Sequence, residues 1–130
     1  MANFMNDKFH YYDNTPKGDT YSNHNNCVCR AISLGTGYGY NEIERLLLEN
    51  SRKCKCDIIT KSCYRKLLEQ YFGLVPRQAL GKSVRMIAKA YPHNNVIMRI
   101  QAHLTCSVNG TLYDIFNCLD ETVDEFWVVK

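Results

Sequence analysis

Residues 101–117 read QAHLTCSVNGTLYDIFN, and this stretch decides the fold prediction because it has the pattern of a single β-hairpin. Two runs rich in β-branched and apolar residues flank Asn109 and Gly110. This dipeptide tolerates positive φ at both central positions and therefore favours a two-residue type I′ turn.

The turn length fixes which residues of the hairpin face one another. A two-residue turn pairs residue 108 with 111, 105 with 114 and 103 with 116. His103 and Asp114 are then diagonal neighbours on one face, about 7–8 Å apart between backbones, which lets an imidazole nitrogen reach a carboxylate. Such a pair can fix the tautomer of a general base.

A candidate nucleophile lies far upstream, in the segment NNCVCRAISLGTG at residues 25–37. Apolar or small residues recur there at i, i+3, i+4 and i+7, the stripe of a helix that packs on a core: Val28, Ala31, Ile32 and Gly35. The glycines at 35–39 end this helix. Cys27 is therefore expected in the first helical turn, where the helix dipole and unpaired backbone N–H groups stabilise a thiolate.

Three more helices are predicted before the strands begin. The second runs from the near-capping-box start at Asn41 to about residue 50, with Ile43, Leu46 and Leu47 buried. Ser62 is expected to cap a third helix that buries Tyr64, Leu67, Leu68 and Tyr71 and stops at Gly73. Ser83 is expected to cap a short fourth helix that buries Val84, Ile87 and Ala88.

From residue 95 onward the pattern is that of strands, at 95–101, 103–108, 111–117 and 122–129; the first two could form one continuous strand. Residues 1–22 lack a helical period and are expected to be a loop or an edge strand. The fold class is therefore α+β, with N-terminal helices packed on a C-terminal antiparallel sheet. The 130 residues fit a single domain, 1–130.

Composition narrows the function classes. Sixteen basic and thirteen acidic residues give a formal charge of +3, and the basic residues are scattered, which argues against nucleic-acid binding. The sequence offers no signal peptide, no membrane span and no lipidation motif, so we expect a soluble cytoplasmic protein.

Seven cysteines are an odd number without an export signal, which favours reduced thiols over a disulfide framework. Cys106 and Cys118 are most simply core or strand-edge residues. Cys54, Cys56 and Cys63 could supply three thiolates to zinc, but their spacing differs from the usual C-x2-C pairs and a fourth ligand would have to come from elsewhere. We therefore predict no metal site and no cofactor, and keep zinc at these three cysteines as an alternative.

Cys27, His103 and Asp114 together fit the chemistry of acyl transfer: a thiolate nucleophile, a histidine acid and base, and an aspartate that orients the imidazole. The Cys27 backbone N–H could donate to an oxyanion. Each of the three is commonly a structural residue when taken alone. The combination is informative because the hairpin register places two of them on one face.

Two segments, NNCVCRAISLGTGYGYNEIERLLLE at 25–49 and HLTCSVNGTLYDIFNCLDETVDEFWV at 103–128, resemble the small papain-like cysteine peptidases of phages and other mobile elements. In that group a helix of the form D/N-C-V-x-R-A-I-S-x-x-T-G opens the domain. A strand pair of the form H-L-x-x-x-x-x-G-x-x-Y-D-x-x-D/N closes it. The similarity covers about residues 23–129, with little in the middle.

The resemblance implies a papain-like fold with the nucleophile at Cys27, the base at His103 and the orienting residue at Asp114. Cys29 departs from the apolar residue usual at its position, and we interpret it as a helix-face residue. The side-chain oxyanion donor has no obvious counterpart, which leaves three candidates: Tyr21, Asn23 and Asn25.

Two functions of different class follow. The first is a cysteine hydrolase that cuts a peptide or isopeptide bond in a peptide or protein substrate. The second is a catalytically silent binding module of a phage or mobile element that acts on a host defence protein, working in the host cytoplasm. That module would make its contacts through the basic surface and the segment 53–63, so charge reversal at Lys53, Lys55 or Arg65 would disrupt it.

Overall fold

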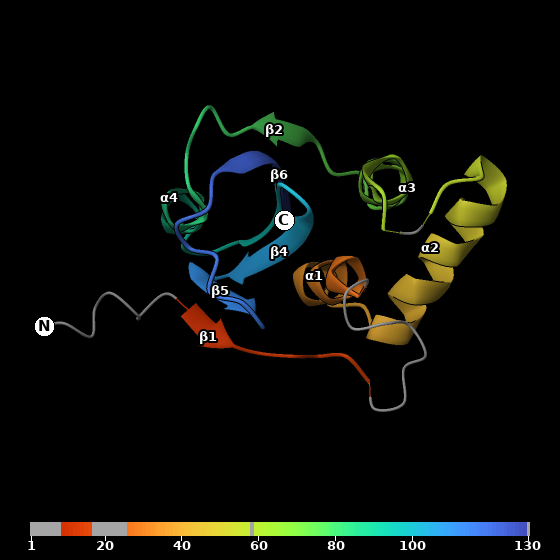
Figure 1. The fold of residues 1–130 in the computed structure, drawn as a ribbon, viewed down its shortest axis with the longest axis horizontal. Coiled ribbons are helices and arrows are strands. Elements are labelled where there is room, and N and C mark those ends of the chain that lie inside the picture. Colours follow the sequence, from red (N-terminus) through yellow and green to blue (C-terminus); the bar gives the residue numbers. More distant parts are fainter. Residues whose placement is uncertain (1–8, 17–25, 58, 130) are drawn as a thin grey trace, which may run out of the picture.

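A computed structural model describes residues 9–16, 26–57 and 59–129, which form an α+β structure around a six-stranded sheet (Figure 1). The helical segments are α1 (Cys27–Thr36), α2 (Tyr40–Cys54), α3 (Lys61–Lys66), the π-helical η2 (Leu67–Tyr71) and α4 (Val84–Ala90). The strands are β1 (Phe9–Tyr11), β2 (Pro76–Gln78), β3 (Asn95–Ile100), β4 (His103–Val108), β5 (Thr111–Asp114) and β6 (Val123–Val129).

The sheet has the order β1-β5-β4-β3-β6-β2, which corrects the prediction of a C-terminal antiparallel sheet. Its four central strands are C-terminal and antiparallel as expected. However, β1 adds to one edge in parallel with β5, and β2 adds to the other edge beside β6. The sheet is therefore mixed. The short segments β1 and β2 pair with the two edges that the central strands leave open.

The hairpin predicted at residues 101–117 is confirmed in register and turn. Val108 pairs with Thr111, and Asn109 and Gly110 both have positive φ, 51° and 83°. The second strand is shorter than predicted and ends at Asp114. A further turn at residues 101–102 reverses the chain, so β3 and β4 form a second hairpin and not one continuous strand.

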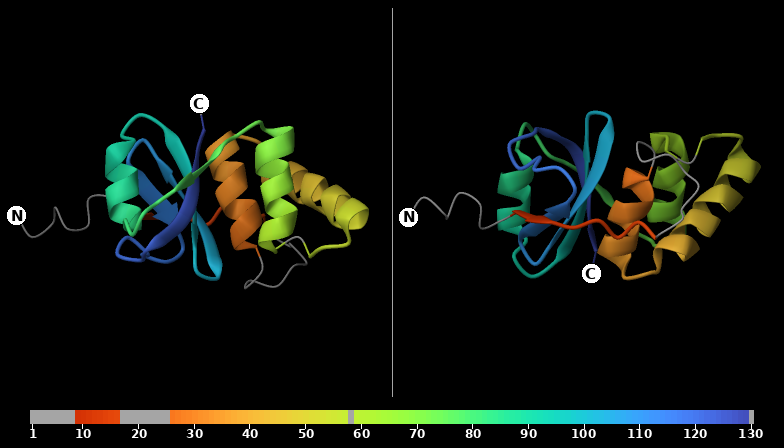
Figure 2. Two further views of the ribbon diagram at one scale, coloured as in Figure 1. Left: turned by 90° about the horizontal axis from the view of Figure 1, so that it is seen from above. Right: turned by 60° about the horizontal axis from the view of Figure 1, so that its bottom comes forward.

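Helices cover both faces of the sheet. Figure 2 shows α4 on one side and α1 on the other, with α2 and α3 outside α1. Side chains alternate between these layers along β3: Ile97 packs with the α1 cluster, whereas Val96 and Met98 pack with the α4 cluster. Trp127 on β6 is fully buried in the α1 cluster.

Helix α1 lies close to the sheet because Gly35 faces β3. A Cβ atom at this position would lie 2.7 Å from Cγ1 of Ile97. The glycine in the predicted apolar stripe therefore permits close packing of the helix on the sheet. This packing also fixes the start of α1, and with it Cys27, against the beginning of β4.

The predicted helix starts were less accurate than the predicted buried faces. Asn41 does not cap α2, which begins at Tyr40 with Gly39 as N-cap and extends to Cys54. Thr60, not Ser62, is the N-cap of α3. The π-helical turn shifts the helical phase, which leaves Tyr71 56% exposed although it was predicted to be buried.

Helix α4 follows the prediction: the Ser83 side chain accepts a hydrogen bond from the Met86 backbone N–H, and Val84, Ile87 and Ala88 are buried. Residues 9–11 form an edge strand, one of the two forms expected for the N-terminal segment. Within the described ranges, no helix combines the length and apolar character that crossing a membrane requires.

Candidate functional site

Cys27 is the first residue of α1 and is half-buried. The preceding Asn26 is the N-cap, yet its side chain makes no capping hydrogen bond. Its amide donates to Thr15 Oγ1 at 3.1 Å, and its carbonyl oxygen accepts from the Arg30 guanidinium. Backbone N–H groups in the first turn of a helix have no acceptor within the helix, and the Cys27 N–H is one of them.

His103 and Asp114 form the contact that the hairpin predicted, with 2.7 Å between Nε2 and Oδ2. Asp114 is buried and also accepts hydrogen bonds from Thr105 Oγ1 at 2.5 Å and from the Ile115 backbone N–H at 2.6 Å. Burial by itself would raise the pKa of Asp114, but these hydrogen bonds and the facing imidazole lower it. The carboxylate is therefore ionised and accepts the Nε2 proton.

The thiol of Cys27 lies within hydrogen-bonding reach of the His103 ring. Because Nε2 faces Asp114, Nδ1 is the nitrogen left for Cys27. Burial disfavours a charged thiolate, but hydrogen bonds with His103 and the Leu104 backbone lower the pKa of Cys27. Burial disfavours the imidazolium as well, yet Asp114 and Cys27 raise the pKa of His103 to about 9.

These opposite shifts favour transfer of the thiol proton to the imidazole, whose charge the Asp114 carboxylate stabilises. The structure thus brings Cys27, His103 and Asp114 together from the start of α1, the start of β4 and the end of β5.

Two cavities lie beside this pair. One, of about 440 Å³, is lined by Cys27, His103, Phe116 and Cys118 among others. The other, of about 220 Å³, is lined by Cys27, His103, Tyr64 and Arg99 among others. An extended chain that crosses Cys27 can place residues in both.

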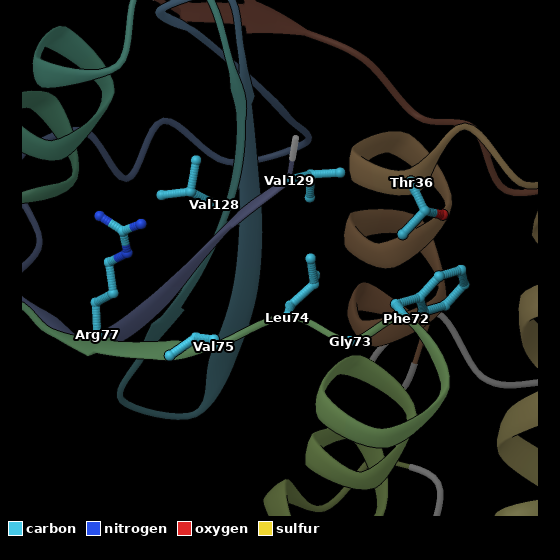
Figure 3. Close-up of a pocket in the computed structure, with 8 residues that line it drawn as sticks. All are labelled: Thr36, Phe72, Gly73, Leu74, Val75, Arg77, Val128 and Val129. Atoms are coloured by element: carbon cyan, nitrogen blue, oxygen red, sulfur yellow. The ribbon is translucent and has the colours of Figure 1, made fainter.

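A third cavity, of about 330 Å³, lies away from these residues, between α1, the segment after η2 and the end of β6 (Figure 3). Thr36, Leu74 and Val129 are among its lining residues, and none of the three predicted site residues reaches it. The larger cavity of about 440 Å³ is thus the one beside Cys27 and His103, where titratable groups also converge.

The cysteines at 54, 56 and 63 do not assemble into a metal site. Cys56 and Cys63 are within hydrogen-bonding reach of one another, and Cys54 is near them. Among the described residues, three ligand atoms come within 4.8 Å of one another only at His103, Asp114 and Cys118. The zinc alternative for the three cysteines is therefore not supported.

Sequence reasoning missed three residues around the pair. Thr105 faces Asp114, the position that the predicted register assigns to it, so the pattern contained this signal. Phe116 stacks edge-on to the His103 ring at 5.5 Å between centroids, and Cys118 donates to Asp114 at 4.0 Å. The predicted register already placed residue 116 opposite residue 103, although β5 ends before it. Cys118 lies further along, at a position that the register does not assign.

Other predicted residues have simpler outcomes. Cys29 is buried in the α1 cluster, and Cys106 and Cys118 are buried as predicted. The three oxyanion-donor candidates, Tyr21, Asn23 and Asn25, lie outside the described residues.

Comparisons with protein-family models, curated proteins and solved structures found no match to this chain. The site is therefore interpreted from its geometry and from the motif resemblance alone.

Proposed function

We propose that the chain is a cysteine hydrolase of papain-like type that cleaves a peptide or isopeptide bond. The observation that carries the proposal is the alignment of Cys27, His103 and Asp114, with the pKa of the thiol lowered and that of the imidazole raised to about 9. Charge separation of this kind costs energy in a half-buried place unless each charge has a partner. A cysteine and a histidine with purely structural roles do not require such a charge separation.

The reaction starts with attack of the Cys27 thiolate on the acyl carbon, which forms a C–S bond and moves the carbonyl electrons onto oxygen. The Cys27 backbone N–H, at the start of α1, stabilises this oxyanion. His103 then donates its Nδ1 proton to the leaving nitrogen as the C–N bond breaks. The products of this half-reaction are a free amine and a thioester on Cys27.

A water molecule completes the cycle. Neutral His103 accepts a proton from the water at Nδ1 while the oxygen attacks the thioester carbon. Collapse of the second tetrahedral intermediate breaks the C–S bond and releases a carboxylic acid. The thiolate and the imidazolium are then restored, and throughout the cycle Asp114 holds Nε2–H and keeps Nδ1 aimed at the sulfur.

The supporting residues suit this role. Thr105 and the Ile115 N–H fix both oxygens of Asp114, so the carboxylate cannot rotate away from His103. Phe116 covers the edge of the imidazole and limits the water around it. The two flanking cavities leave room for substrate residues on either side of the scissile bond.

An activated ester tests the proposal without knowledge of the natural substrate. We expect p-nitrophenyl acetate to acylate Cys27, as mapped by mass spectrometry, and the acyl group to turn over. Cys54→Ser is the matched thiol control and should behave like the parent protein, whereas Cys27→Ala should lose the turnover. Acylation spread evenly over the half-buried cysteines, or unchanged turnover in Cys27→Ala, would contradict the proposal.

The alternative of a silent binding module makes a different prediction. Its effect on a host protein would survive Cys27→Ala, and charge reversal at Lys53 or Lys55, both exposed, would abolish it. Arg65 is less suitable for that test because it is paired with Glu69 at 2.9 Å and with Glu125 at 3.5 Å. Reversal at Arg65 would also disturb contacts within the protein.

A further inference from the structure

Cys118 is a buried thiol that the proposed hydrolysis does not use. It follows β5, and its Sγ lies 4.0 Å from Asp114 Oδ2. The Ile115 N–H contacts the other carboxylate oxygen, Oδ1. One ligand atom each from His103, Asp114 and Cys118 lie within 4.8 Å of one another. Nitrogen, oxygen and sulfur donors thus converge on one small volume.

This donor set suits zinc, which binds His nitrogen, carboxylate oxygen and Cys sulfur at ~2.0–2.3 Å. Ligand atoms of a tetrahedral site are consequently about 3.3–3.8 Å apart. The His103–Asp114 contact at 2.7 Å would have to open slightly, and the Asp114–Cys118 contact at 4.0 Å would have to close slightly. The third pair, His103 and Cys118, lies within 4.8 Å and would have to close by at most about 1.5 Å.

The surroundings meet two further requirements of a metal site. Thr105 and the Ile115 N–H already hold the Asp114 carboxylate, which is how outer residues orient metal ligands. The cavity of about 440 Å³ is lined by both His103 and Cys118, so an ion can enter from solvent and keep a water molecule as fourth ligand.

We propose that His103, Asp114 and Cys118 form a Zn²⁺-binding site whose occupation stops the acid–base chemistry of His103. Binding releases the Nε2 proton and the Cys118 thiol proton to solvent. The remaining ring proton is on Nδ1, and loss of it would leave an imidazolate, so zinc-bound His103 cannot serve as general acid. Metal binding is independent of Cys27, whereas its inhibitory effect rests on the proposed hydrolase function.

The test measures Zn²⁺ binding directly, by competition with a chromophoric chelator, in the 130-residue chain that carries Cys54→Ser and Cys56→Ser to remove two half-buried thiols. We expect one Zn²⁺ per chain. In this background Cys118→Ser should weaken binding at least tenfold, while Cys27→Ala should bind as tightly as the background protein. Circular dichroism of each variant checks that it is folded.

Two results would overturn the proposal: no stoichiometric binding, or binding lost in Cys27→Ala and retained in Cys118→Ser, which would place the ion between Cys27 and His103. X-ray absorption of the zinc-loaded Cys27→Ala protein measures the number and type of zinc ligands while Cys118 is left intact. We expect one sulfur with two or three nitrogen or oxygen neighbours; no sulfur, or several, contradicts the site. Ester turnover by metal-free protein tests the hydrolase separately.

Discussion

Cys27 and Cys63 both lie in the first turn of a helix, yet their thiols have opposite properties. His103 and the Leu104 backbone lower the pKa of Cys27 against the effect of burial. Burial raises the pKa of Cys63 to about 12, and the neighbouring Cys56, Cys54 and Asp57 add to the increase. The charge of the neighbouring groups therefore decides thiolate formation, and a helix N-terminus is not sufficient.

The helix predicted to start at Ser62 already put Cys63 in a first turn, and the structure places Cys63 at the third position of α3. Its thiol donates a buried hydrogen bond to the Leu47 carbonyl at 3.6 Å and so has a structural role. Reactivity is still expected at Cys27, for the reason that an imidazolium faces it.

The largest effect is expected from removal of that imidazole. His103→Ala should lower the alkylation rate of Cys27 at pH 6 by roughly 10²-fold or more, since the thiolate loses its counter-charge. Cys63 should stay unreactive in both proteins. An equal rate in His103→Ala would mean that the helix alone sustains the thiolate, and the difference between the two cysteines would need another cause.

The pH dependence of Cys27 alkylation sharpens the same point. In urea an ordinary thiol, with a pKa near ~8.5, gains about tenfold in rate per pH unit between pH 6 and 8. In the folded protein the lowered pKa should move the rise in the Cys27 rate to lower pH than in urea. A rise that begins at the same pH as in urea, or at higher pH, would contradict the lowered pKa.

The rate of peptide hydrolysis should also decrease at alkaline pH. His103 must be protonated to act as general acid, and its pKa is raised to about 9, so activity should fall as pH rises through that value. The same protonation stabilises the fold below the unfolded pKa of ~6.5, and this contribution should disappear as pH rises through about 9.

A smaller effect is expected at the orienting carboxylate. Asp114→Asn keeps the side-chain shape but removes the charge that stabilises the imidazolium, so Cys27 alkylation at pH 6 should slow about tenfold. One pKa unit at His103 corresponds to such a factor. The matched control is Asp124→Asn, which removes an exposed carboxylate paired with Arg99 and should leave the rate unchanged.

The smallest effect concerns Thr105, which donates to Asp114 and is 1% exposed. Thr105→Val is nearly isosteric and removes a hydrogen bond to a charged group, so unfolding in urea should require about 1.5–3 kcal/mol less. Cys27 alkylation should slow only a few-fold. Unchanged stability would show that the hydroxyl does not hold the carboxylate.

The sequence predicted those elements whose signals are local. The Asn-Gly turn fixed the register of β4 and β5, and the apolar stripe after Cys27 fixed α1 and the position of the thiol in its first turn. Both signals come from residues adjacent in the chain, where turn chemistry and helical period act directly.

The remaining features depend on contacts between distant segments. The pairing of β1 with β5 and of β2 with β6 joins segments that carry no shared pattern. The π-helical turn at η2 shifts Tyr71 outward without a sequence signal. Phe116 lies beside His103 as the predicted register implied, but Cys118 reaches the site from the segment after β5, whose course depends on packing and not on period.

Competitive alkylation of all seven cysteines of the native protein at pH 6, mapped by mass spectrometry, tests the central claim most directly. We predict that Cys27 takes the first equivalent of iodoacetamide, ahead of the half-buried Cys54 and Cys56, and that Cys63 stays unlabelled. Labelling of Cys54 or Cys56 before Cys27 would contradict a thiolate–imidazolium pair at the start of α1, and with it the proposed catalytic site.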